Sequence, residues 1–199
     1  MSHAPFLRVE NVTMRFGKFT ALSGVSVDFQ ANQLTAIIGP NGAGKSTFFN
    51  VLSGSLKPTE GRVYFEGEDV TDLKPHEYAR HGIAKSFQIT NVFKQLSVHE
   101  NVRVAAQMRH ARFDMLTPRA KLQECIDEAD ELLQRVGLHA LRHKPVSDLA
   151  HGQQRALEIA MALASRPRLL LMDEPTAGMS PEETTSMMAL IEALAEERT

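Results

Sequence analysis

Residues 7–29 alternate between hydrophobic and polar positions with the period of two that is typical of strands. Glycines at 17 and 24 interrupt the alternation. A short apolar run, LTAIIG at 34–39, predicts a buried strand that enters a glycine-rich turn, and KSTFFNVLSG (45–54) predicts a helix that ends at a glycine. The segment RVYFEGEDV (62–70) alternates again. The first part of the chain is therefore expected to be rich in strands around one strand–loop–helix unit. The alternating hydrophobic residues are Leu7, Val9, Val12, Met14, Phe16, Val25, Val27 and Phe29.

The period changes to that of helices from residue 97. Ser97 and Glu100 have the spacing of a capping box and predict a helix that continues to about His110. Thr117 followed by Pro118 predicts the start of a second helix. Two helices without a strand between them indicate an inserted helical lobe. The apolar stripe of the second helix, closed by Gly137, consists of Leu122, Cys125, Ile126, Ala129, Leu132, Leu133 and Val136.

An α/β pattern returns in the last part of the chain. The apolar run LLLMDEP (169–175) predicts a strand that ends in two acidic residues. Ser180, Pro181 and Glu183 then predict the start of one more helix, which runs to the end of the sequence. The sequence contains no internal repeat, low-complexity tract or flexible linker. We therefore expect an α/β fold with a helical insertion.

Composition limits the classes of function. The chain has 199 residues, 43% of them hydrophobic, which is enough for one sizeable core with or without a smaller lobe. A net charge of −2 argues against a protein that coats nucleic acid. No segment approaches the roughly 20 apolar residues of a membrane span, and the first residues do not have the pattern of a signal peptide. Cys125, the single cysteine, excludes an internal disulfide and is expected to be buried in a cytosolic protein.

A phosphate-binding loop is predicted at residues 39–46, where GPNGAGKS matches the full G-x-x-x-x-G-K-[ST] pattern between a strand and a helix. Glycines let successive backbone N–H groups turn toward phosphate oxygens, and the positive end of the following helix points at the same anion. Lys45 is expected to reach the β- and γ-phosphates, and the Ser46 hydroxyl to bind Mg²⁺. The nucleotide-binding residues predicted here are Gly39, Pro40, Asn41, Gly42, Ala43, Gly44, Lys45, Ser46 and Thr47.

An acidic pair follows the predicted strand at 169–172. Asp173 at the tip of this strand is expected to bind Mg²⁺, and Glu174 to polarise an attacking water as a general base. An acidic pair after a strand is often only a solvated turn, but together with a phosphate loop it indicates catalysis.

With these motifs, the chain resembles the nucleotide-binding subunit of an ABC transporter over essentially its whole length. The motifs GPNGAGKST, KSFQ (85–88), LAHGQQRALEIA (149–160) and LLLMDEP follow the order of that family. KSFQITNVFKQLSVHENV and TAGMSPEE look most like the branch that serves branched-chain amino-acid importers. The resemblance implies a P-loop NTPase core of the ABC-ATPase type with an N-terminal antiparallel β subdomain at 1–88 and 165–199, and an α-helical signature subdomain at 89–164.

The resemblance also implies roles for individual residues. Phe16 stands where the family has an aromatic residue that stacks on adenine, although a core position at a strand edge fits it equally well. Gln88 matches the glutamine that contacts Mg²⁺ and the attacking water and couples the site to the membrane partner. The implied cofactors are ATP and Mg²⁺, with Glu174, Gln88 and Lys45 as catalytic residues and Ser46, Gln88 and Asp173 as metal ligands.

The segment LAHGQ corresponds to the family signature, usually Leu-Ser-Gly-Gly-Gln, which closes over ATP held by a second subunit. Leu149, Ala150, His151, Gly152 and Gln153 are therefore expected to contact ATP in trans within a head-to-tail dimer. Ala150 replaces a serine whose hydrogen bond to phosphate is worth about 1.5–3 kcal/mol. The helix that begins near Gly152 still directs N–H groups at the anion, and His151 is either a phosphate donor when protonated or an exposed spectator.

Two departures from the family pattern affect the expected activity. Ser180 stands where many members have an aspartate that helps to couple the two sites. The family also has a switch histidine beyond one further helix and strand, and no histidine follows His151 here. We therefore expect a fragment or truncated product that binds ATP, with hydrolysis to be tested.

The leading hypothesis is a cytoplasmic, membrane-peripheral energy-coupling subunit that works with transmembrane permease subunits and a second, identical or different, ATP-binding subunit, and with no nucleic acid. A soluble ABC-type ATPase would be expected to show a second cassette, a long heptad segment or a basic stripe, and none of these appears in the sequence. A GTPase would be expected to show an Asn-Lys-x-Asp motif, and none occurs. A nucleotide-binding fragment without turnover stays as an alternative.

Overall fold

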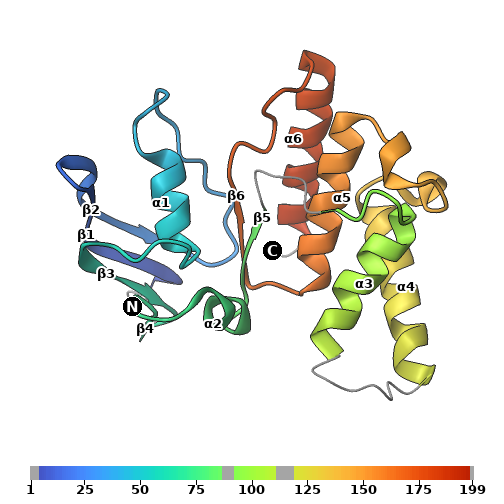
Figure 1. The fold of residues 1–199 in the computed structure, drawn as a ribbon, viewed down its shortest axis with the longest axis horizontal. Helices are drawn as coiled ribbons and strands as arrows, with labels where there is room; N and C mark the ends of the chain where they lie inside the picture. Colours follow the sequence, from blue (N-terminus) through green and yellow to red (C-terminus); the bar gives the residue numbers. More distant parts are fainter. Residues whose placement is uncertain (1–4, 87–91, 111–118, 198–199) are drawn as a thin grey trace. The chain divides into compact units, whose positions relative to one another are not determined.

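A computed structural model describes residues 5–86, 92–110 and 119–197. The chain divides into two compact units, the first up to residue 83 and the second from residue 84 to 194, with the residues from 195 onward counted with the first. Figure 1 shows the elements of both units along the chain.

The first unit is built on a four-stranded antiparallel sheet in the order β2-β1-β3-β4. This confirms the predicted N-terminal antiparallel β subdomain. The break in phase between Val9 and Val12 has a structural cause, because the register shifts there and Asn11 adopts a φ of 49°. The bulge returns the hydrophobic side chains to the buried face of the sheet. The strands are β1 (Leu7–Phe16), β2 (Phe19–Phe29), β3 (Glu60–Phe65) and β4 (Glu68–Asp69).

Two helices complete the first unit. Helix α1 (Lys45–Leu52) follows the predicted phosphate loop and buries Phe48, Val51 and Leu52. Its cap residue is Ser53, so the predicted helix is confirmed and ends within two residues of the expected glycine. The short α2 (Pro75–Arg80) buries Tyr78, and burial raises the pKa of that phenol to about 12.

The predicted strand at 34–39 is wrong in this structure. Residues 33–40 have no regular secondary structure, and Leu34 and Ile38 are 51% and 92% exposed. A strand requires a neighbour for its N–H and C=O groups. In the part of the first unit that the structure describes, β1 to β4 pair only with one another, so this apolar run has no strand beside it.

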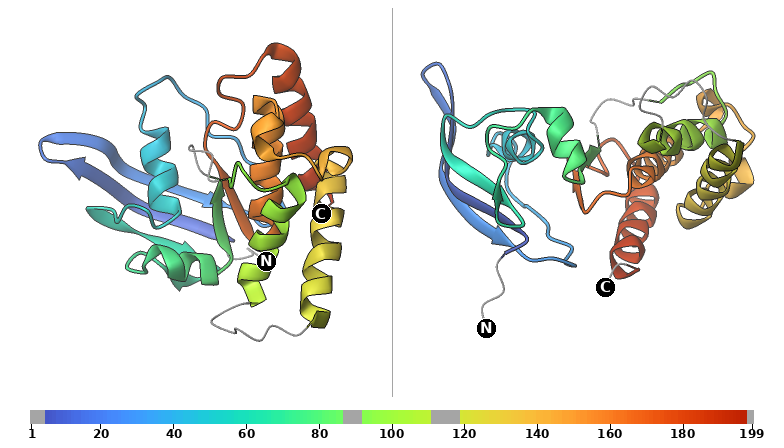
Figure 2. Two further views of the ribbon diagram at one scale, coloured as in Figure 1. Left: turned by 45° about the vertical axis from the view of Figure 1, so that its right-hand side comes forward. Right: turned by 90° about the horizontal axis from the view of Figure 1, so that it is seen from below.

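The second unit contains a two-stranded sheet and a group of packed helices. Strands β5 (Ile83–Ser86) and β6 (Leu169–Met172) pair with each other. Helices α3, α4 and α5 pack against one another, and the two views of Figure 2 both show α3 beside α4. This confirms the predicted helical lobe. The helical elements are α3 (Val98–His110), α4 (Arg119–Arg135), η1 (His139–Leu141), η2 (Val146–Asp148), α5 (His151–Ala164) and α6 (Pro181–Glu196).

Hydrogen bonds at the starts of α3 and α6 match the predicted capping patterns. The Ser97 hydroxyl accepts a bond of 3.1 Å from the Glu100 N–H, as the capping pattern predicts. Ser180 and Glu183 form the complete reciprocal box, with the Glu183 N–H bonded to the Ser180 hydroxyl and the Ser180 N–H to the Glu183 carboxylate, at 3.2 and 3.0 Å. The predicted start at 117–118 lies outside the described residues.

The core of the second unit explains the helical spacing of its apolar residues. Cys125 is buried as expected, at 1% exposure, on the stripe of α4 that faces α3 and α5. No helix in the described ranges is both long and apolar enough to span a membrane. The core includes Val98, Val102, Ala106, Ala129, Leu133, Leu157, Ala160 and Ile191.

Candidate functional site

The loop before α1 has the backbone that its glycines predict. Gly42 and Gly44 have φ values of 81° and 85°, and Gly44 is the N-cap of α1. The Lys45 ammonium folds back over the loop and donates to the carbonyl oxygens of Gly39 and Pro40 at 2.7 and 2.9 Å. These two hydrogen bonds hold the Lys45 side chain against the loop. The first turn of α1 carries no acidic side chain that would repel an anion.

Gly44 has a second constraint besides its left-handed backbone. A Cβ atom at this position would lie 2.5 Å from the carbonyl oxygen of Ala21 and 3.1 Å from the Leu22 side chain. At Gly42 a Cβ atom would meet nothing within 4 Å. The loop therefore packs closely on β2 at Gly44 and is open at Gly42.

Phe16 is the last residue of β1 and pairs with Phe19, the first residue of β2, across the turn between the two strands. Its side chain is 47% exposed. An aromatic ring exposed at the end of a strand can stack on a flat ligand, whereas a core position is excluded by this exposure.

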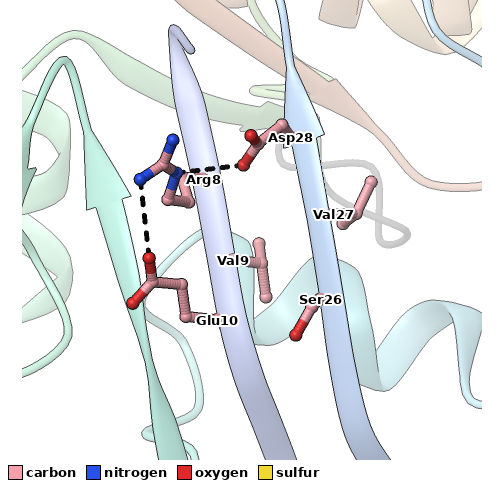
Figure 3. A pocket seen from close by; sticks show the side chains of 6 residues that line it. All are labelled: Arg8, Val9, Glu10, Ser26, Val27 and Asp28. Atoms are coloured by element: carbon pink, nitrogen blue, oxygen red, sulfur yellow. Dashed lines mark hydrogen bonds and ion pairs between the residues drawn. The ribbon is translucent and has the colours of Figure 1, made fainter. Parts of the chain in front are cut away.

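The same sheet has a shallow depression over β1 and β2 (Figure 3). The guanidinium of Arg8 crosses it and pairs with Asp28 at 3.1 Å and with Glu10 at 3.6 Å. Its charge is thus balanced by neighbours on the same surface. The depression contains none of the residues predicted for the site, since its lining is Arg8, Val9, Glu10, Ser26, Val27 and Asp28.

The acidic pair at the end of β6 has two different environments. Asp173 is 2% exposed, and its carboxylate lies 4.0 Å from the Lys85 ammonium on the neighbouring β5. Burial lowers the pKa of Lys85, and the Asp173 charge opposes that shift. Glu174 is exposed and adopts a φ of 49°, which is uncommon for a residue with a side chain. One acid is therefore fixed inside the unit, and the other projects from a strained turn.

The signature segment begins α5. Ala150 is the N-cap without a side-chain cap, and its N–H donates to the side-chain oxygen of Gln153 at 3.1 Å. The backbone oxygen of Leu149 accepts a hydrogen bond of 2.9 Å from the side-chain amide of Gln154, which also holds the segment to α5. His151 is exposed at the first position of the helix.

Gly152 lies beside the Glu183 side chain at the start of α6. A Cβ atom there would lie 3.1 Å from the carboxylate of Glu183, which is also the capping residue of α6. The glycine therefore allows the starts of α5 and α6 to lie close together. This contact is inside the second unit and does not depend on a ligand.

One functional candidate was missed by the sequence analysis. Arg155 and Glu158 form an ion pair of 2.6 Å with exposures of only 12% and 9%, and Arg155 also donates to the carbonyl oxygens of Asp173 and Glu174. Burial raises the pKa of Glu158, and the hydrogen bond from Arg155 opposes it. A sequence signal exists, because this is the only charged pair in the otherwise apolar segment RALEIAMALA (155–164).

The predicted site residues are distributed over both units. Phe16 and residues 39–47 belong to the first unit, and residues 149–153, Asp173 and Glu174 belong to the second. Within the second unit the structure connects the signature helix to the acidic pair through Arg155. Gln88 lies outside the described residues. Among the residues that are described, no cluster of three or more His, Cys, Asp and Glu side chains is arranged to hold a metal.

Comparisons with known proteins agree with this set of motifs. The profile of the ABC transporter family matches residues 22–177. The high-affinity branched-chain amino acid transport ATP-binding protein BraF of Pseudomonas aeruginosa is 41% identical over 200 residues, which cover 97% of this chain and 78% of BraF. The ADP conformation of the ATP-binding cassette MJ1267 superposes with a TM-score of 0.85 at 34% identity, over 98% of this chain and 79% of MJ1267. The dimeric post-hydrolysis state of the cassette MJ0796, bound to ADP and Pi, superposes with a TM-score of 0.77 at 31% identity, over 96% of this chain and 83% of that one.

Proposed function

Because this chain belongs to the ABC transporter family, we propose that it is the ATP-binding and ATP-hydrolysing subunit of an importer for branched-chain amino acids. The single observation that carries the nucleotide site is the loop at 39–46, in which two left-handed glycines precede a helix that begins at Lys45 and has no acid in its first turn. The choice of solute is supported by the similarity to BraF, which is named for transport of branched-chain amino acids.

ATP is proposed to bind with its phosphates on the loop at 39–47 and its adenine against Phe16. Lys45 already lies over the loop, where its ammonium donates to two carbonyl oxygens that a phosphate would replace as acceptors. The exposed ring of Phe16 offers an apolar face to the base. The similarity to a cassette solved with ADP supports this assignment.

Mg²⁺ is proposed as the metal, held by Ser46, Gln88 and Asp173. A hydroxyl, an amide oxygen and a carboxylate are the hard oxygen donors that Mg²⁺ prefers, and the usual remaining ligands are waters and phosphate oxygens. One carboxylate is sufficient for such a site. When bound, Mg²⁺ would neutralise charge on the terminal phosphates.

Glu174 is proposed as the general base, with Gln88 and Lys45 as the other catalytic residues. The general base must be exposed to the water that it polarises, and Glu174 is exposed while its neighbour Asp173 is buried. Lys45 would stabilise the negative charge that grows on the transferred phosphate. The similarity to a cassette bound to ADP and Pi supports hydrolysis.

The signature residues 149–153 are proposed to contact ATP held by a second subunit. The N-cap of α5 has no side-chain acceptor, so the N–H groups of its first turn are available to an incoming anion. The proposed assembly is a head-to-tail dimer, of two copies or of two different ATP-binding subunits, on the cytoplasmic face of permease subunits. The helical residues 89–164 are proposed as the subdomain that contacts the permeases, and residues 1–88 with 165–199 as the ATP-binding core.

ATP binding tests the first half of this proposal. We expect the purified chain and its Glu174→Gln variant to bind ATP with the same affinity, measured by calorimetry, because Glu174 acts on water and not on the nucleotide. If neither protein binds ATP, the assignment of the loop is wrong.

A further inference from the structure

The guanidinium of Arg155 connects the signature helix to the backbone on both sides of the proposed general base. Its Nη2 atom donates to the carbonyl oxygen of Asp173 at 3.3 Å and to that of Glu174 at 3.4 Å. Its Nη1 atom donates to the Glu158 carboxylate at 2.6 Å. One side chain of α5 thus contacts two consecutive peptide groups that are 18 and 19 residues away in sequence.

The relative orientation of these two carbonyl groups depends on the conformation of Glu174. They belong to the peptide planes before and after its Cα atom, so their relative orientation is set by the φ and ψ angles of Glu174 alone. A φ of 49° places a glutamate in the left-handed region, which is unfavourable for a residue with a side chain unless the surroundings hold it. A donor shared by both carbonyls opposes any rotation that separates them.

The position of the guanidinium is itself fixed. Arg155 and Glu158 lie three residues apart on α5 and are both largely buried, so their pair has little freedom to reorient in solvent. The Glu174 carbonyl also accepts from the Ala177 N–H at 3.1 Å, which makes it the common acceptor of the turn and of Arg155. The turn at 174–177 is therefore hydrogen-bonded to α5 through Arg155, in addition to its covalent connection to β6.

We propose that Arg155 is a positioning residue that holds the backbone of Glu174, and so the direction of its carboxylate, in register with the signature helix α5. The contacts that carry this role are those of Arg155 with Glu158 and with the two carbonyl oxygens. Any displacement of α5 is transmitted to the proposed base through this side chain. The inference rests on the proposed function for the role of Glu174, but the contact that it describes exists in the chain without nucleotide.

Two variants test the contact. Arg155→Lys keeps a charge beside Glu158 and removes the fork that reaches the two carbonyls. The double variant Arg155→Met with Glu158→Met replaces the buried pair by apolar side chains of similar length, a change that proteins often tolerate because no charge is left buried alone. The matched control is Arg166→Met, which breaks a pair with Glu128 in the same unit, 3.1 Å long, whose arginine is 69% exposed.

The first readout is hydrogen exchange at the Ala177 amide in the full chain without nucleotide. We expect exchange at least tenfold faster in Arg155→Lys and in the double variant, and unchanged exchange in Arg166→Met. Unchanged exchange at Ala177 in Arg155→Lys or in a folded double variant would overturn the inference.

The second readout is steady-state ATP turnover, in which we expect kcat to fall at least tenfold with KM within twofold of wild type, because the base is misdirected while the phosphate loop is intact. A fall of the same size in Arg166→Met would also overturn the inference. Absence of turnover in the wild-type chain would count against the proposed hydrolysis, and the exchange at Ala177 would still decide the role of Arg155.

Discussion

Substitution of Gly44 by alanine should damage the phosphate loop far more than substitution of Gly42, although both glycines have nearly the same backbone angles. Their φ values are 85° and 81°, so each alanine would carry the same left-handed cost of about 1–2 kcal/mol. Only at Gly44 does the new methyl group meet backbone, at 2.5 Å from the Ala21 oxygen, where ordinary contact begins at 3.4 Å. Relief requires β2 and the loop to separate.

The size of this difference follows from the cost of overpacking. Inserting a methyl group into a closed contact costs about 1–3 kcal/mol, which brings Gly44→Ala to a total of about 2–5 kcal/mol against about 1–2 kcal/mol for Gly42→Ala. Because the strain lies at the N-cap of α1, we also expect weaker ATP binding in Gly44→Ala.

Urea unfolding of both variants and of wild type, with ATP titration by calorimetry, measures these effects. Since both substitutions add one methyl group to the same loop, Gly42→Ala serves as the matched control. Equal unfolding midpoints for the two variants would mean that the contact between Gly44 and Ala21 does not constrain the loop, contrary to this prediction.

Two further predictions concern single hydrogen bonds. Ala150→Ser should stabilise the chain by about 1 kcal/mol, because it adds a hydroxyl acceptor at an N-cap that has none, and an unchanged urea midpoint would contradict this. Thr71→Val should make stability less dependent on acid pH. The Thr71 hydroxyl donates to the Asp69 carboxylate and lowers the pKa of Asp69 in the folded chain, so the stability from this bond is present above the unfolded pKa, near 4, and is lost as pH falls through the lowered folded value; the bond from the Thr71 backbone N–H is kept in the variant. Urea midpoints of wild type and Thr71→Val at pH 7 and pH 3 measure this. If the two proteins differ by the same amount at both pH values, the prediction is wrong, and only the bond from the Val63 N–H to the Thr71 hydroxyl contributes to stability.

The sequence predicts well those features that depend on neighbours in the chain. The capping box at Ser180 and Glu183 needs only three residues of separation, and both of its bonds are present. The bulge at Asn11 was not predicted, although the extra residue between Val9 and Val12 reverses the side-chain alternation there. The glycines of the phosphate loop have the left-handed angles that its pattern requires.

Features that depend on distant partners are not predictable in this way. The run at 34–39 is apolar enough for a buried strand, but apolar character does not specify which strand will pair with it, and none does among residues 5–83. Arg155 and Glu158 are visible in the sequence only as a charged pair within an apolar helix. Their contact with the turn after β6 is 18 residues away and needs the structure.

Hydrolysis by this chain is tested by Mg²⁺-dependent release of phosphate from ATP, compared between the wild-type chain and Glu174→Gln. We expect measurable release by the wild-type chain and a loss of about 10²–10⁴-fold on substitution, with ATP still bound, because the variant keeps the phosphate loop and lacks the general base. No release by the wild-type chain, or release that survives the substitution, would contradict this expectation.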